Sequence, residues 1–155
     1  MKKLLTALLA GAALTMATTA PAVAKVKVAC VGNSITYGAT IPDRERDSYP
    51  SQLARMLGPD YEVGNFGRSG ATLMKRGHHP YNATKECADA KNFAGDIAVI
   101  HLGVNDTDPR DWPDFSDDFV NDYVELIDSL RARNPKVRVI IANISPVRTT
   151  HYRWR

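Results

Sequence analysis

Residues 26–36 read VKVACVGNSIT, and this stretch decides the fold class. Its first six residues are mostly apolar and rich in valine, which is typical of a buried strand. Gly32 closes the run, and Asn33-Ser34 then stands where a helix would begin. A continuous apolar strand that leads into a helix indicates a parallel sheet covered on both faces.

Three more apolar runs follow, at 61–66, 96–102 and 137–144, and helical patterns separate them. Residues 48–57 have helical spacing and end at Gly58-Pro59, and residues 115–133 form the clearest helix. One face of that helix carries Phe119, Tyr123, Leu126, Ile127 and Leu130. Strands alternating with helices predict an α/β fold with a three-layer, doubly wound parallel sheet, in one domain over residues 25–155.

The N-terminal residues predict a leader that is separate from the fold. Lys2 and Lys3 precede an apolar run over residues 4–14, and Ala22-Val23-Ala24 is a small-x-small cleavage site. A membrane helix is the alternative, but the apolar run is shorter than the roughly 20 residues that a span needs. We therefore expect a signal peptide over residues 1–24 and a periplasmic or secreted protein.

The other end of the chain predicts that sequence is missing. Only a short tail follows residues 137–144, and no helix follows to cover that strand. A parallel strand buried on both faces normally has neighbours. We therefore expect a C-terminal strand and helix to be absent, and the chain to be the N-terminal portion of a longer protein.

Composition excludes several partners. The formal net charge is +3, and two of the basic residues lie in the leader. A nearly neutral domain predicts no nucleic-acid partner and no membrane partner after signal cleavage. Neither C-x-x-C nor H-E-x-x-H occurs, so we expect no metal and no cofactor. We expect Cys30 and Cys87 to form no disulfide; the oligomeric state stays open.

Three strand ends carry residues suited to ester chemistry. Parallel strands of a doubly wound sheet place ligands beyond their carboxyl ends. The first end holds Ser34, which could cap a helix or act as a nucleophile. The second holds Gly70, whose backbone N–H could approach a substrate oxygen closely, although a flexible turn explains it too. The third holds Asn105, whose side chain could cap a turn or donate to an oxyanion.

Together, these three strand ends resemble the SGNH hydrolase family, also called GDSL esterases. The blocks are Gly32-Asn33-Ser34, with Asn33 where the family usually has Asp, then Asn65 with Gly70, and Gly103-Val104-Asn105-Asp106. The resemblance implies a flavodoxin-like sheet, Ser34 as nucleophile, and an oxyanion hole made by the N–H groups of Ser34 and Gly70 and the side chain of Asn105.

Residues 65–73 and 100–107 also look like the N-terminal catalytic module of bacterial sialate O-acetylesterase-like proteins. Those are secreted or periplasmic enzymes that remove acetyl groups from sugars. This likeness implies a carbohydrate O-acetylesterase with an acetylated sugar as its small-molecule substrate. The acyl group and the sugar stay open.

The family's last block, D-x-x-H, is absent. None of His78, His79, His101 and His151 has an acidic residue three positions earlier. A serine hydroxyl is a poor nucleophile without a base. We expect His101 to be a strand residue, His78 and His79 to be solvated loop residues, and His151 to fray. The chain as given should therefore be inactive or weakly active.

Two other functions stay open on the sequence. The strand ends could form a non-catalytic carbohydrate-binding remnant of such a hydrolase. The chain could also bind a flavin or nucleotide, with Ser34 and Thr36 holding phosphate. The second alternative leaves Gly70 and Asn105 unexplained and lacks both glycine-rich phosphate motifs.

Overall fold

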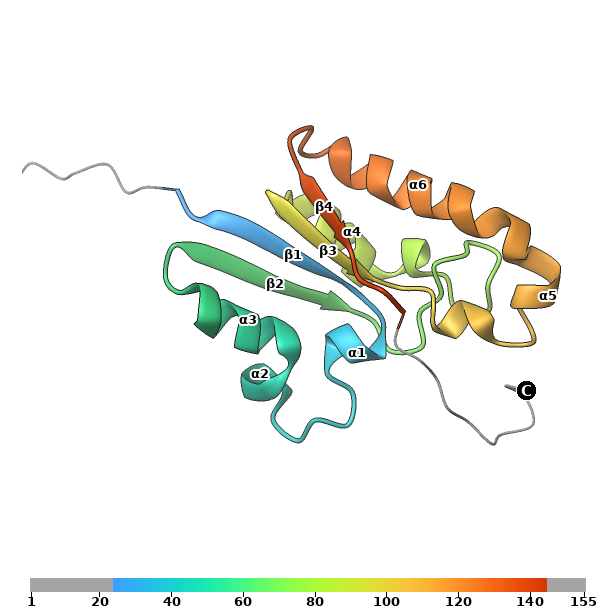
Figure 1. Ribbon diagram of the computed structural model, residues 1–155, viewed down its shortest axis with the longest axis horizontal. Helices are drawn as coiled ribbons and strands as arrows, with labels where there is room; N and C mark the ends of the chain where they lie inside the picture. The colour runs from blue at the N-terminus through green and yellow to red at the C-terminus, as the bar shows by residue number, and fades with distance from the viewer. Residues whose placement is uncertain (1–23, 145–155) are drawn as a thin grey trace, which may run out of the picture.

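The computed structural model describes residues 24–144 (Figure 1). The predicted signal peptide, apart from Ala24, and His151 lie outside these residues. The strands are β1 (Val26–Gly32), β2 (Tyr61–Gly67), β3 (Ile97–His101) and β4 (Arg138–Ile141). The α-helices are α1 (Ser34–Tyr37), α2 (Arg44–Asp47), α3 (Tyr49–Leu57), α4 (Lys85–Phe93), α5 (Trp112–Phe115) and α6 (Phe119–Arg131). Short 3-10 turns are η1 (Tyr81–Ala83), η2 (Asn105–Thr107) and η3 (Ser116–Asp118).

The four strands form one parallel sheet in the order β2-β1-β3-β4. Helices α1, α2 and α3 lie on one side of the sheet, and α4 and α6 lie on the other (Figure 1). This confirms the predicted three-layer α/β fold. The strand order reverses at β1, because the chain adds β2 on one side and β3 on the other. Gly32 pairs with both Gly67 and His101, so three strand ends meet where such sheets bind ligands.

Strand β1 is the centre of the core. Ala29 and Val31 face the layer of α4 and α6, where they join a cluster with Ile100, Leu126 and Leu130. Cys30 points to the other layer, and its burial raises the pKa of the thiol to about 11. Both Cys30 and Cys87 are buried and carry free thiols. Within residues 24–144, no helix has the length and apolarity needed to cross a bilayer.

Helix α6 differs from the prediction at its start. It begins at Phe119 rather than at residue 115, because residues 112–115 form the separate short helix α5 and residues 116–118 form the 3-10 turn η3. Its predicted apolar face is confirmed, since Leu126 and Leu130 are buried and Phe119, Tyr123 and Ile127 pack against the core.

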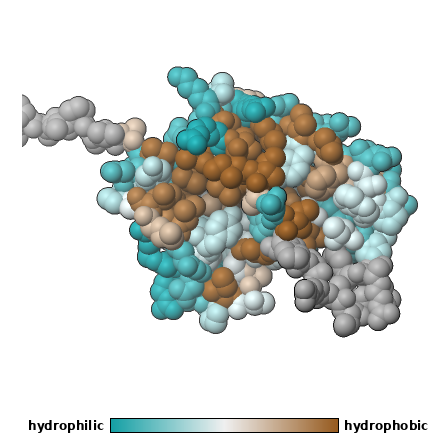
Figure 2. Space-filling model, in the orientation of Figure 1, coloured by the Kyte–Doolittle hydropathy of each residue, from teal (hydrophilic) through white to brown (hydrophobic). Residues whose placement is uncertain are grey.

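Strand β4 is poorly covered, as expected for a strand that no helix follows in the sequence. Ile140 and Ile141 are 47% and 55% exposed. No helix of the described residues covers the face of β4 opposite α6. Val120 and Val124 of α6 are exposed as well, and Figure 2 shows apolar surface over this part of the molecule.

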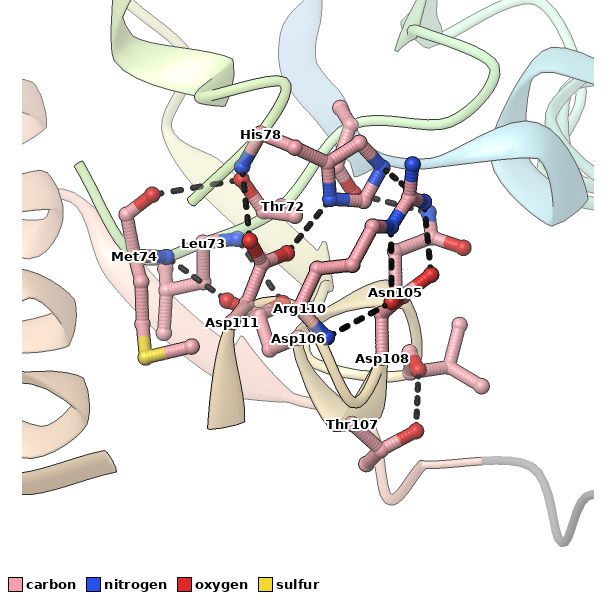
Figure 3. Close-up of polar contacts among 12 residues, drawn as sticks. Thr72, Leu73, Met74, His78, Asn105, Asp106, Thr107, Asp108, Arg110 and Asp111 are labelled. Atoms are coloured by element: carbon pink, nitrogen blue, oxygen red, sulfur yellow. Dashed lines mark hydrogen bonds and ion pairs between the residues drawn. The ribbon is translucent and has the colours of Figure 1, made fainter. Parts of the chain in front are cut away.

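The loop after β2 is held by buried carboxylates rather than by regular secondary structure (Figure 3). Asp106 is fully buried and accepts the N–H groups of Leu73, at 2.9 Å, and Met74, at 2.7 Å. Asp111 accepts the N–H of His78 at 3.0 Å, and Asp122 accepts the N–H of Lys75 at 2.7 Å. These aspartates follow β3 in the chain, so they join the loop after β2 to the segment after β3 and to α6, across the end of the central strand β1.

We expect Asp106→Ala to lower the free energy of unfolding by about 2–4 kcal/mol, because two buried N–H groups lose their acceptor. Urea denaturation followed by circular dichroism measures the change. Asp60→Ala is the control, since Asp60 is exposed, and it should stay within about 0.5 kcal/mol of the wild type. Equal losses in the two variants would contradict the role given to Asp106.

Candidate active site

Ser34 is the first residue of α1, and Asn33 is the residue that caps this helix. The Asn33 side-chain oxygen accepts the N–H of Ile35 at 2.9 Å. The alternative in which Ser34 serves as the cap is therefore wrong, and the Ser34 hydroxyl does not cap the helix. The Ser34 N–H also has no acceptor inside the helix, as is usual for a first turn.

Asn33 departs from the Asp that is usual in the family, and the structure shows one effect of this. Its side chain is fully buried. The oxygen caps α1, but the Nδ2 group finds no hydrogen-bond partner within residues 24–144. An aspartate would present acceptors only, so the unused donor is specific to the asparagine.

Gly67 lets β2 approach α1 at the edge of the site. A Cβ on Gly67 would lie 2.1 Å from the backbone nitrogen of Tyr37, which no larger residue allows. Asn65 supports the same turn, because its side-chain oxygen accepts the N–H of Gly67 at 3.0 Å. Just beyond, the N–H of Arg68 donates to Gly32 O at 2.8 Å and joins the first two strand ends.

Gly70 has φ of 79°, in the left-handed region that favours glycine. The next amide, Ala71 N–H, donates to Arg68 O. The Gly70 N–H makes no hydrogen bond within the part of the chain that the structure describes. It is therefore available to a substrate oxygen, as the prediction requires.

Asn105 begins η2, immediately beyond β3, and it is tied to the Gly70 loop. Its Nδ2 donates to Ala71 O at 2.8 Å. One N–H of the carboxamide is thus used to fix its position, and the second is free for another acceptor. This bond brings the second and third predicted strand ends together. The predicted roles of Ser34, Gly70 and Asn105 stay predictions that this placement supports.

Asp106 follows Asn105 and holds the loop after Ala71. Burial raises the pKa of its carboxyl, and the N–H donors of Met74 and Leu73 oppose that shift. Asp106 was quoted in the motif but received no role from the sequence. Its contacts join residues 32 and 33 positions apart, and no local pattern reveals them.

His78 takes part in a polar cluster that the sequence did not predict (Figure 3). Its Nδ1 lies 2.5 Å from the buried carboxylate of Asp111, and its Nε2 lies 3.3 Å from Arg110. Arg110 also binds Asp108 through two contacts of 2.8 and 2.7 Å, which hold the pKa of Asp108 below its usual range. His78 is therefore not simply solvated, although 32% of its side chain is exposed.

The described histidines do not supply an evident base for Ser34. The Asp111 carboxylate contacts His78 Nδ1 in the way that a carboxylate orients a catalytic imidazole. The other ring nitrogen, Nε2, contacts Arg110 and is not free to accept a proton from Ser34. His101 lies in β3 and is 8% exposed, which confirms its prediction as a strand residue. His79 lies beside Gly70 and has no carboxylate partner within residues 24–144. In the same range, no group of three acidic, histidine or cysteine side chains is placed to hold a metal.

Comparisons with known proteins agree with this geometry. The sequence profile of the GDSL-like Lipase/Acylhydrolase family matches residues 30–155. An acetylxylan esterase of Xylanibacter ruminicola is 41% identical over 112 residues, which cover 72% of this chain and 23% of that protein. The chain thus spans less than a quarter of this relative's length.

Several solved structures share the fold at low identity. A family two carbohydrate esterase from Clostridium thermocellum, in complex with cellohexaose, has a TM-score of 0.57 at 23% identity, covering 85% of this chain and 47% of that chain. A carbohydrate acetylesterase family member from Sinorhizobium meliloti has a TM-score of 0.55 at 21% identity, covering 75% and 61%. The M. smegmatis aryl esterase has a TM-score of 0.56 at 20% identity, covering 75% and 62%.

The profile match covers most of the chain, and it includes all three strand ends that carry Ser34, Gly70 and Asn105. The chain therefore belongs to the GDSL-like lipase/acylhydrolase family, also called the SGNH hydrolases.

Proposed function

We propose that this chain is the nucleophile-bearing part of a carbohydrate O-acetylesterase. The observation that carries the proposal is the bond from Asn105 Nδ2 to Ala71 O, which fixes a carboxamide donor beside the free N–H of Gly70. Ser34 stands at the adjacent strand end with an unused N–H of its own. Three uncharged donors around one serine suit the negative oxygen of an acyl-transfer intermediate.

The proposed reaction has two steps. Ser34 Oγ attacks the acetyl carbonyl while its proton passes to a base, and the bond to the sugar oxygen breaks as that oxygen takes up a proton. Water then attacks the acetyl-serine, which releases acetate and restores the hydroxyl. We place the base outside residues 24–144. Among the described histidines, His78 contacts Arg110 through its second ring nitrogen, His101 is buried, and His79 has no carboxylate partner.

Two likenesses support acetylated sugar as the substrate. The relative from Xylanibacter ruminicola is named an acetylxylan esterase. Residues 65–73 and 100–107 resemble sialate O-acetylesterase-like modules. Both point to an acetyl ester on a sugar, although to different sugars. A second candidate function is a carbohydrate-binding module without turnover. The observation that favours it is that the described residues supply no base for Ser34.

We expect Ser34→Ala, made in the full-length gene product, to lower turnover of p-nitrophenyl acetate by at least about 1,000-fold, because the acyl-enzyme can no longer form. Ser129→Ala is the matched control, since Ser129 lies on α6 and bonds only Leu126 O, and it should leave turnover within about twofold. Unchanged turnover in Ser34→Ala would remove Ser34 from the mechanism. Sugar binding without turnover in the wild type would favour the binding module.

We expect Asn105→Ala to lower kcat by roughly 100- to 1,000-fold with a smaller effect on KM, because the carboxamide stabilises charge that develops after binding. Asn121→Ala is the control, since Asn121 is exposed on α6. Thermal denaturation of both variants separates loss of the donor from loss of the bond to Ala71. A kcat that follows stability alone would contradict the proposed oxyanion role.

We also propose that the protein is exported, on the basis of the leader over residues 1–24. Mass spectrometry of the protein recovered from the periplasm or medium of a bacterial host should find Lys25 as its first residue. A product that keeps Met1 and stays in the cytoplasm would contradict export.

A further inference from the structure

A pocket of about 370 Å³, lined by both polar and apolar side chains, lies between the loop after β2 and the start of α4. Arg68 lines one side, His79 and Pro80 line another, and Thr84 to Glu86 at the start of α4 close it. Arg68 is bonded through its N–H to Gly32 O, two residues before Ser34. A Cβ on Gly70 would lie 3.2 Å from His79 Nδ1, so one residue that lines the pocket also lies against Gly70.

Two of the residues that line this pocket, Arg68 and Glu86, form an ion pair. Their closest atoms, Arg68 Nη1 and Glu86 Oε1, are 3.4 Å apart, and the side chains are 48% and 27% exposed. Within residues 24–144, the other guanidinium N–H groups of Arg68 and the second carboxylate oxygen of Glu86 have no protein partner. The pair therefore offers fixed donors and acceptors side by side, which is what adjacent sugar hydroxyls require.

The charges favour a neutral ligand over an anionic one. Glu86 balances Arg68, and Lys85, which is 82% exposed, is paired with Asp89. A carboxylated sugar would have to compete with Glu86 for Arg68, whereas the hydroxyls of a neutral sugar can bind both partners without separating them. An aliphatic acyl chain would suit the apolar groove between α6 and Ile141 better than this pocket.

We propose that the Arg68–Glu86 pair is a substrate subsite that binds adjacent hydroxyls of a neutral, acetylated sugar, such as a xylosyl unit. The proposal rests on the proposed esterase function for the origin of the substrate. It adds the residues that select the alcohol side of the ester, and it favours a neutral sugar over sialic acid.

Kinetics on three esters test the subsite in the full-length gene product. The variants are Arg68→Met and Glu86→Gln, and the control is Glu125→Gln, which alters the pair between Glu125 of α6 and Lys75 of the loop after β2. The quantity compared is kcat/KM on acetylated xylo-oligosaccharide divided by kcat/KM on p-nitrophenyl acetate. We expect this ratio to fall about tenfold in both variants and to change less than twofold in the control.

An unchanged ratio in both variants would overturn the proposal. The proposal would also be overturned if the wild type preferred 9-O-acetyl sialic acid to the neutral ester and Arg68→Met abolished that preference. Arg68 would then bind a carboxylate. Thermal denaturation confirms that each variant is folded, and both substituted side chains lie partly at the surface.

A binding measurement separates this proposal from the esterase proposal. Saturation-transfer NMR detects xylotriose on the Ser34→Ala protein, which cannot turn over. If the wild type cleaves neither ester, the esterase proposal fails, and the binding result still decides the subsite. Loss of the xylotriose signal in Arg68→Met and Glu86→Gln, but not in Glu125→Gln, supports it; an equal signal in all of them overturns it.

Discussion

Backbone N–H groups of the loop after β2 donate to buried aspartates, and the rest of the site depends on this interaction. Residues 73–78 have no strand or long helix to satisfy their amides, and a buried amide without an acceptor is costly. Asp106, Asp111 and Asp122 supply the acceptors from sequence 32 to 47 residues later. Because Asp106 is next to Asn105, the same contacts set the distance between the carboxamide and the Gly70 loop.

The proposed oxyanion donors come from both the backbone and a side chain. In the proposed oxyanion hole, the amides of Ser34 and Gly70 take their positions from a strand end and a left-handed turn, and the third donor is the carboxamide of Asn105. The neighbouring Arg68 and Glu86 sit on the solvent side of the same loop and of α4. Their side chains hold none of the three strand ends in place, so the proposed subsite and the proposed oxyanion donors can be altered separately.

Much of the fold could be predicted from the sequence, since it rests on local patterns. Each of these patterns is contained in a short stretch of sequence: the apolar run at 26–31, the helix stop at Gly58-Pro59 and the apolar face of α6. Which residue caps α1 could not be predicted, because asparagine and serine cap helices about equally well and stand side by side at 33 and 34. The aspartate contacts and the Arg68–Glu86 pair could not be predicted either, because folding alone brings their partners together. The exposure of β4, in contrast, could be predicted, because no helix follows residues 137–144 in the sequence to cover that strand.

The capping of α1 by Asn33 and the bond from Asn105 to Ala71 share a consequence for how the site responds to its surroundings. Every donor around Ser34 is an amide, and amides neither gain nor lose a proton over the range in which proteins stay folded. The contribution of these donors to the field at the proposed oxyanion position is therefore constant with acidity, and mobile ions screen fixed neutral dipoles weakly. In an enzyme built on this frame these donors add nothing to the acidity profile, which instead reports titratable groups such as the base that takes the proton from Ser34 and the buried Asp106 carboxyl.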